Sequence, residues 1–85
     1  MSDAETIDRL RDLITYIACS LVDDPDAVEV QTIDEEKQVV IELTVGEGDL
    51  GKVIGKEGRT ARAMRTLLTA TSARMQKRAL LDILE

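Results

Sequence analysis

The chain has 85 residues, of which 44% are hydrophobic and 33% are charged, and its net charge is −6. This length favours a single domain over residues 1–85 with little room for a deep catalytic cleft, and the composition favours a globular fold over a disordered chain. No apolar run approaches the roughly 20 residues that span a membrane, and the acidic start MSDAETIDRL is unlike a secretory signal. We therefore expect a cytoplasmic protein.

The first predicted element is an amphipathic helix over residues 3–22. Its apolar side chains recur every three or four positions, at Ile7, Leu10, Ile14, Ile17 and Leu21. Acidic residues near its start suit the partial positive charge of a helix N-terminus. The helix is expected to stop before Pro25, because proline prevents its continuation.

Residues 27–45 are predicted to form an antiparallel hairpin. Ala27–Ile33 is the first strand, and Asp34–Lys37 is a polar turn. Gln38–Val45 alternates between apolar and polar residues, with Val40 as the exception, and forms the second strand.

A helix–loop–helix is predicted over residues 49–75. Asp49 is expected to cap a short helical turn that ends at Ile54, and a glycine-containing segment interrupts it. A long helix then runs from Arg59 to about Met75, and its methionines are interpreted as core filler.

The last predicted element covers residues 78–85, which include four leucine or isoleucine side chains. Its local pattern fits either a prolonged helix or a final strand. The order of all elements predicts an α+β fold, in which helices cover one face of a small sheet as a two-layer sandwich.

The residue types that are missing argue against an enzyme. Histidine is absent, which removes the commonest general base and the commonest metal ligand. Cys19 is the single cysteine, so neither an intrachain disulfide nor a multi-cysteine metal site is available. We expect no cofactor and no catalysis, and the helical pattern around Cys19 favours a buried structural thiol over a reactive one.

All five glycines fall within GEGDLGKVIGKEG, at positions 46, 48, 51, 55 and 58. Three phosphate-binding interpretations compete for this stretch. Gly46–Gly51 fits the dinucleotide fingerprint G-x-G-x-x-G, and Gly46–Lys52 fits most of a P-loop. Gly55–Gly58 fits the G-x-x-G clamp of a nucleic-acid-binding module.

The first two interpretations conflict with the surrounding sequence. The dinucleotide fingerprint requires an acidic residue about 20 positions further on, where this chain has Thr69–Ala73, and it requires a larger parallel sheet. The P-loop requires Ser or Thr at the position of Val53. In both cases Glu47 and Asp49 would repel the phosphate.

The third interpretation is supported by a family resemblance. The stretch LGKVIGKEGRTARAMR, residues 50–65, contains Val53-Ile54-Gly55-Lys56-Glu57-Gly58. It resembles the V-I-G-x-x-G signature of KH domains, and more closely the small bacterial KH proteins of the KhpA family. The resemblance covers essentially the whole chain. It implies a type II KH fold, α-β-β-α-α-β, with a three-stranded sheet, a final strand at residues 78–85, and binding of single-stranded RNA.

The chemistry of this segment agrees with a clamp on a sugar-phosphate backbone. Gly55 and Gly58 allow close approach of a ligand, and the amides at the start of the following helix carry partial positive charge. KH modules hold about four nucleotides in this way. The expected RNA-binding residues are Lys52, Val53, Ile54, Gly55, Lys56, Glu57, Gly58, Arg59 and Arg62.

These residues are expected to have different roles. The four cations pair with phosphates, whereas Glu57 offsets part of the charge of Lys56. Val53 and Ile54 are candidates for an aliphatic groove that holds bases, and the sequence leaves open whether Ile54 lines that groove or lies in the core. Ala61 stands where KH domains often carry a larger aliphatic residue, which leaves the groove depth open.

Charge and aromatic content also bear on nucleic-acid binding. Residues 1–50 carry a net charge of −11 and residues 51–85 carry +5. Such asymmetry is typical of a protein that meets an anion on one side, although it also fits an uneven surface without a partner. Tyr16 is the single aromatic residue, which argues against folds that stack bases on rings. The later bases are interpreted as solvated charges near a helix end: Arg74, Lys77 and Arg78.

The resemblance to KhpA proteins also implies partners. Such proteins self-associate, pair with a larger KH protein of the KhpB (Jag) type, and are linked to post-transcriptional regulation and to cell elongation and division. We expect a regulator or RNA chaperone that binds single-stranded RNA as a homodimer or heterodimer. The alternative is a protein-interaction module with vestigial RNA binding, which the acidic hairpin and the net charge favour.

Overall fold

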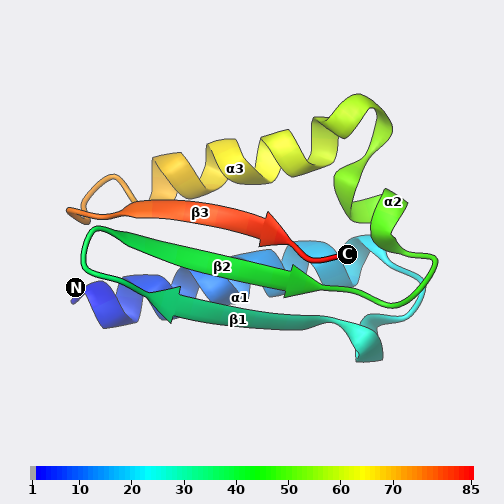
Figure 1. Ribbon diagram of the computed structural model, residues 1–85, viewed down its shortest axis with the longest axis horizontal. Helices are drawn as coiled ribbons and strands as arrows, with labels where there is room; N and C mark the ends of the chain where they lie inside the picture. Colours follow the sequence, from blue (N-terminus) through cyan, green and yellow to red (C-terminus); the bar gives the residue numbers. More distant parts are fainter. Residues whose placement is uncertain (1) are drawn as a thin grey trace.

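A computed structural model describes residues 2–85 (Figure 1). The elements run α-β-β-α-α-β, with two short 3-10 turns, η1 and η2, between them. In chain order they are α1 (Asp3–Leu21), η1 (Pro25–Ala27), β1 (Glu29–Asp34), β2 (Gln38–Thr44), α2 (Leu50–Ile54), η2 (Lys56–Gly58), α3 (Arg59–Thr71) and β3 (Arg78–Ile83). The last segment is therefore a strand and not a prolonged helix.

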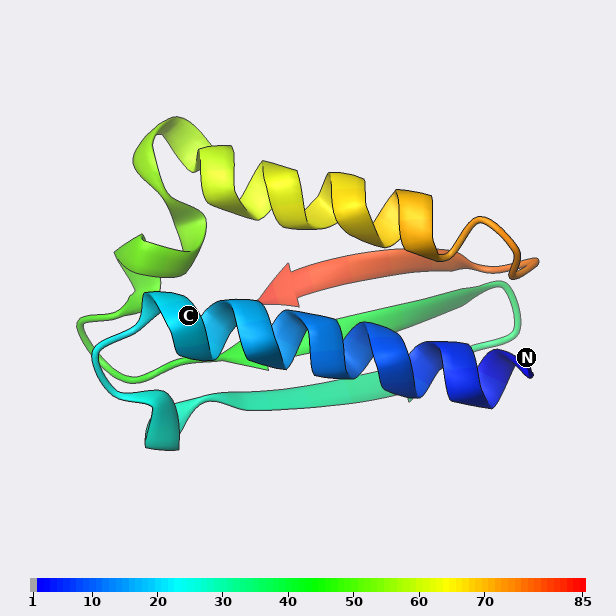
Figure 2. The ribbon, with the colours of Figure 1, turned by 180° about the vertical axis from the view of Figure 1, so that it is seen from behind.

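The three strands form one sheet with β2 in the centre. β1 pairs with β2 in antiparallel orientation, and β3 pairs with β2 in parallel orientation. A parallel pair needs a crossover connection, which α2 and α3 supply. Figure 2 shows α1 and α3 in front of the strands, so the helices cover one face of the sheet. The predicted two-layer α+β fold is confirmed.

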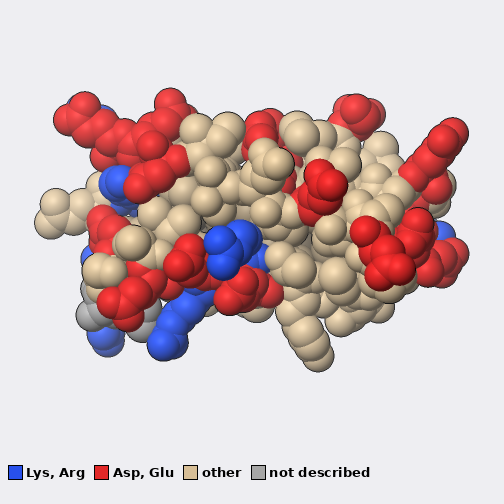
Figure 3. All heavy atoms as spheres, turned by 90° about the horizontal axis from the view of Figure 1, so that it is seen from below, with Lys and Arg blue, Asp and Glu red and all other residues tan. Residues whose placement is uncertain are grey.

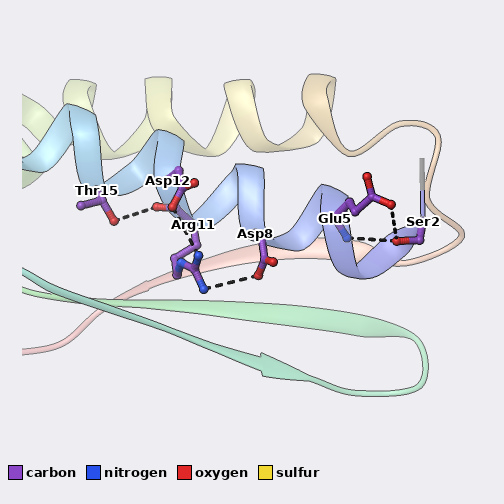
Figure 4. A network of polar contacts seen from close by, with 6 residues as sticks. All are labelled: Ser2, Glu5, Asp8, Arg11, Asp12 and Thr15. Carbon is purple, nitrogen blue, oxygen red and sulfur yellow. Dashed lines mark hydrogen bonds and ion pairs between the residues drawn. The ribbon is translucent and has the colours of Figure 1, made fainter.

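Helix α1 is fixed at its start by local polar contacts (Figure 4). The Ser2 hydroxyl oxygen accepts a hydrogen bond from the Glu5 amide at 3.2 Å and donates one to the Glu5 carboxylate. On the exposed side, Arg11 lies 3.4 Å from both Asp8 and Asp12. The opposite side of the helix carries the side chains that enter the core: Ile7, Leu10, Ile14 and Ala18.

The central strand supplies the middle of the core. Alternate residues of β2 point toward the helices, and Val39, Ile41 and Leu43 are fully buried there. Met64 and Leu68 of α3 pack against the same cluster. The sheet thereby fixes the position of α3, at whose start the glycine segment lies.

Helix α3 ends at Thr71, so the prediction that it continues to about Met75 is wrong. The Ser72 amide closes the last turn on the Leu68 carbonyl at 3.0 Å, and the Thr71 hydroxyl donates to the Leu67 carbonyl at 2.7 Å. Such side-chain bonds weaken the helical ladder near its end. Met75 lies in the turn after α3, but its side chain is buried in the core. The spacing of Met75 from the buried residues of α3 therefore fitted a longer helix.

Two further expectations need correction near the end of α1. The first strand begins at Glu29 rather than Ala27, because Pro25 starts the η1 turn that occupies the preceding residues. Cys19 is half-buried rather than buried, and its sulfur lies 4.0 Å from the Pro25 carbonyl oxygen. No helix within residues 2–85 is both long enough and apolar enough to cross a membrane.

Candidate nucleic-acid interface

The Gly55–Gly58 segment forms a sharp bend between α2 and α3 (Figure 1). Gly55, Glu57 and Gly58 have φ values of 78°, 57° and 74°, in the left-handed region that side chains disfavour. At Gly55 a Cβ atom would also lie 2.3 Å from the Thr60 hydroxyl oxygen. Backbone conformation and packing therefore both require glycine at position 55.

Gly58 leaves the start of α3 open to a ligand. A Cβ atom at this position would meet no atom closer than Arg62 Nη2, at 3.7 Å. Gly58 is the N-cap residue of α3, and no side chain caps this helix end. The first amides of a helix lack partners within the helix and carry partial positive charge. The Gly58 and Arg59 amides bond to the Gly55 and Lys56 carbonyls, so the surface open to a phosphate is the positively polarised start of α3 that follows them, which no side chain caps.

Three cations surround this backbone. Lys56 is exposed and takes part in no ion pair within residues 2–85. Arg59 lies 3.9 Å from the Glu57 carboxylate, and both side chains are largely exposed, so this pairing is weak. Arg62 Nη2 donates a hydrogen bond to the Glu57 carbonyl oxygen at 2.5 Å. Arg62 therefore braces the bend, while Lys56 and Arg59 face solvent.

Lys52, also predicted to contact phosphate, is occupied by two carboxylates. Its Nζ lies 3.1 Å from Asp23 and 3.1 Å from Asp49. Hydrogen bonds to Asp23 and then to Asp49 raise the pKa of Lys52 above its ordinary value. Its charge is balanced locally, which reduces what Lys52 can contribute to an incoming phosphate.

Asp49 anchors α2 to the end of α1. Its buried carboxylate accepts hydrogen bonds from the backbone amides of Asp23 and Asp24 at 3.2 and 3.1 Å. Burial acts to raise the pKa of Asp49, but these amides and the Lys52 ammonium outweigh burial and lower that pKa. The predicted side-chain cap on α2 is wrong, because the carboxylate is turned toward the loop after α1.

The two aliphatic residues before Gly55 lie in different surroundings. Val53 is fully buried and belongs to the core, so its side chain is not available to a base. Ile54 is only partly buried. The sequence left its role open between groove and core, and the partial burial of Ile54 leaves part of its side chain accessible from solvent.

Basic side chains are concentrated on α3. This helix contains three arginines and no acid. Figure 3 views the molecule from the side that carries β1 and α1, and more Asp and Glu than Lys and Arg are seen on that face. The charge asymmetry of the sequence is therefore partly a spatial one, although Asp23 and Asp49 surround Lys52 of α2.

Comparison with known proteins identifies the family. The model described as KhpA/KhpB, KH domain, matches residues 11–83. The chain belongs to the KhpA/KhpB family of KH domains.

Relatives in the KhpA/KhpB family match most of the chain. The RNA-binding protein KhpA of Aquifex aeolicus is 54% identical over 76 residues, which cover 89% of this chain and 96% of the relative. The proteins of the same name from Caldanaerobacter subterraneus and Clostridium acetobutylicum are 48% and 43% identical, over 86% and 88% of this chain and 97% and 100% of their own lengths. No solved structure matches the chain.

In this KhpA/KhpB domain, the structure groups six of the predicted site residues at the bend: Gly55, Lys56, Glu57, Gly58, Arg59 and Arg62. It assigns Val53 to the core and Lys52 to the Asp49 network. Sequence reasoning missed the anchoring role of Asp49. Its signal was an acid three residues before Lys52, but the backbone amides that it binds lie 25 and 26 positions away in the chain.

Proposed function

We propose that this chain binds single-stranded RNA without catalysing a reaction, by clamping the sugar-phosphate backbone at Gly55–Gly58. The observation that carries the proposal is the open, uncapped start of α3 at Gly58 beside two solvent-facing cations, Lys56 and Arg59. The relatives are named as RNA-binding proteins, which supports the same assignment.

Each part of the site has a physical role in this proposal. A phosphate oxygen accepts hydrogen bonds at the start of α3 while Lys56 and Arg59 balance its charge. Arg62 holds the bend in shape through the Glu57 carbonyl, and the exposed part of Ile54 offers an apolar contact to a base. The carboxylate of Glu57 reduces the positive potential, so affinity is modest.

The cellular role belongs to the same proposal. An RNA-binding protein that makes few phosphate contacts and does no chemistry is suited to act as a post-transcriptional regulator or RNA chaperone. Linking two such modules raises the effective concentration of the second one. We therefore include a homodimer, or a heterodimer with a larger KhpB (Jag)-type protein, among the proposed assemblies.

The clamp is tested by replacing Lys56 and Glu57 together with Asp. Titration of a labelled single-stranded RNA, followed by fluorescence anisotropy, is expected to show a loss of affinity of about tenfold or more, since a charged contact is removed and a like charge added. The matched control changes Lys37 and Glu36 to Asp, because this exposed pair in the β1–β2 turn gives the same change in composition.

The two variants separate the possible results. An unchanged affinity in the Lys56/Glu57 variant, with an intact fold by circular dichroism, would show that the clamp hypothesis is wrong. An equal loss in both variants would show that binding follows net charge and not the glycine bend.

A second candidate function is protein association with vestigial RNA binding. It is favoured by large apolar side chains on the surface, since Tyr16 is 73% exposed, Ile33 45% and Leu67 44%. Light scattering of the pure protein over a range of concentrations tests the homodimer directly. A strict monomer at high concentration contradicts it.

A further inference from the structure

A hollow of about 340 Å³ lies between the first half of α1 and the turn that follows α3. Figures 1 and 2 show these two segments at the same end of the molecule, because α1 and α3 run in opposite directions. The hollow has an apolar floor, since Leu10 and Met75 are buried and Leu13 is half-buried. Its volume lies in the range of small-ligand pockets.

Two arginines from different elements line this hollow, Arg9 of α1 and Arg74 of the turn. Both are exposed, and neither takes part in an ion pair within residues 2–85. A guanidinium group presents donors that match the oxygens of a phosphate or a carboxylate. Asp3 adds one carboxylate to the lining. The hollow therefore favours a ligand with a single anionic group over one with several.

Two threonine hydroxyls around the hollow have already donated their hydrogens. Thr6 Oγ1 donates to the Ser2 carbonyl oxygen at 3.2 Å, and Thr71 Oγ1 donates to the Leu67 carbonyl oxygen at 2.7 Å. Each hydroxyl oxygen keeps lone pairs that accept hydrogen bonds. Together with the Asp3 carboxylate they provide acceptors for a ligand that carries N–H or O–H donors.

We propose that this hollow binds a nucleoside monophosphate. The phosphate lies between Arg9 and Arg74, and the base covers the apolar floor. The ribose hydroxyls and an amino group of the base donate to Asp3 and to the threonine oxygens. A simple aliphatic anion leaves these acceptors unused, whereas a nucleoside without phosphate loses the charge-assisted hydrogen bonds of the two arginines.

The hollow is separate from the glycine bend. Gly58 precedes the first residue of α3 and Thr71 is the last, so 13 residues at 1.5 Å each place the two ends of the helix about 20 Å apart. A nucleotide in the hollow leaves the bend free. The inference therefore goes beyond the proposed function and does not depend on it.

Titration with adenosine 5′-monophosphate (AMP), followed by the amide chemical shifts of the isotope-labelled protein, tests the site. Shifts are expected around residues 6–13 and 71–75. Adenosine and inorganic phosphate are each expected to bind about tenfold more weakly, since the first lacks the charged contact and the second does not reach the floor. Equal affinity for AMP and adenosine, or for AMP and inorganic phosphate, would show that the nucleotide assignment is wrong.

Arg74→Gln keeps the aliphatic stem and is expected to weaken AMP binding about tenfold. The matched control is Arg78→Gln, which removes the same charge four residues further on, from an exposed arginine of β3 that does not line the hollow. It is expected to leave AMP binding unchanged. An unchanged affinity in Arg74→Gln, or an equal loss in both variants, would overturn the proposal.

A free mononucleotide and the 5′-terminal nucleotide of an RNA share this chemistry. We distinguish them with a tetranucleotide that carries either a 5′-phosphate or a 5′-hydroxyl, titrated into the Lys56/Glu57 variant. If the 5′-phosphate raises the affinity and further introduction of Arg74→Gln removes the gain, an RNA end occupies the hollow. If only AMP responds to Arg74→Gln, the ligand is the free nucleotide.

The location of the chemical shifts keeps this inference distinct from the clamp. Shifts centred on residues 55–59 would place AMP at the glycine bend, which overturns the inference and leaves the clamp standing. If the Lys56/Glu57 variant keeps its full RNA affinity, the clamp is wrong, whereas AMP binding that depends on Arg74 still supports the hollow.

Discussion

At the scale of single residues, the bend depends on backbone conformations that are unfavourable for most side chains. Glu57 is the one residue other than glycine with a positive φ within residues 2–85. The left-handed conformation costs such a residue about 1–2 kcal/mol. The Arg62 hydrogen bond to the Glu57 carbonyl holds that conformation in place. The protein thus keeps an unfavourable backbone beside the site, where a ligand can approach it.

The glycines of the chain are predicted to differ sharply in their tolerance of substitution. Gly55→Ala places a Cβ 2.3 Å from the Thr60 hydroxyl oxygen at a positive φ, and it is expected to lower the free energy of unfolding by about 1–3 kcal/mol. Gly51→Ala meets no atom within 4 Å in helix α2, and it is expected to raise that free energy by about 0.5–1 kcal/mol. Urea unfolding of both variants measures the difference, and equal effects would contradict the close packing at Gly55.

At the scale of elements, the Asp49 carboxylate joins α2 to the loop that follows α1. It accepts two backbone amides and one ammonium, so it satisfies groups that would otherwise be left without partners. Helix α2 has five residues, too few to be stable alone. The position of the glycine bend therefore depends on this anchor.

The anchor is predicted to make stability depend on pH. The lowered pKa of Asp49, below its ordinary value of 3.8, means that the ionised group stabilises the fold above about pH 4 and that this contribution is lost as the pH falls through the lowered pKa. Asp49→Asn is therefore expected to have a lower urea midpoint than the unchanged protein at neutral pH, and this difference in midpoint is expected to narrow as the pH is lowered below 3.8.

The control for this experiment is Asp26→Asn, an exposed acid of the same loop region. Its urea midpoint is expected to stay close to that of the unchanged protein at neutral and at acidic pH. A gap between Asp49→Asn and the unchanged protein that is constant with pH would show that the Asp49 charge is not what holds α2.

Sequence reasoning recovered the elements whose signals are local. Helix α1 follows from its apolar spacing and from Pro25, and β2 follows from its alternation. β3 needed the family resemblance, because consecutive leucines show no alternation from which a strand is recognised. The end of α3 was misjudged because an apolar residue such as Met75 is spaced in the sequence as a helix predicts, whether it is buried by a helix or by a turn.

The candidate site was likewise predictable only where its residues are close in sequence. Gly55 and Gly58 are visible as a motif, and their cations are close in sequence. The burial of Val53 and the pairing of Lys52 were not predictable, because both depend on residues that the fold brings from elsewhere.

At the scale of the whole molecule, the net charge and the proposed RNA-binding surface have opposite signs. Most acids lie in residues 1–50, while the bend and α3 carry Lys56 and three arginines against one acid, Glu57. Long-range repulsion of RNA by the acidic side is screened at physiological salt, where the Debye length is about 8 Å. A protein with a net charge of −6 is therefore able to bind a polyanion over a short range.

This separation predicts that RNA affinity depends only weakly on salt concentration. Two cations at the bend face solvent and are free to approach phosphates: Lys56 and Arg59. With about 0.7 counterions released per phosphate, the plot of log affinity against log salt for a short RNA is expected to have a slope of about −1.4. Anisotropy titrations at several salt concentrations measure it, and a slope near zero would show that phosphate contacts do not drive binding.

The parallel pairing of β2 with β3 has a consequence for the newly made chain. Each pair in this ladder joins residues 40 positions apart, and β3 is synthesised after every other element within residues 2–85. Contacts so distant in sequence form late in folding. Until residues 78–83 leave the ribosome, one edge of the central strand is unpaired, and an open strand edge invites association with other chains. The glycine bend therefore emerges before β3 pairs with β2, and translation itself delays completion of the fold around the proposed RNA-binding bend.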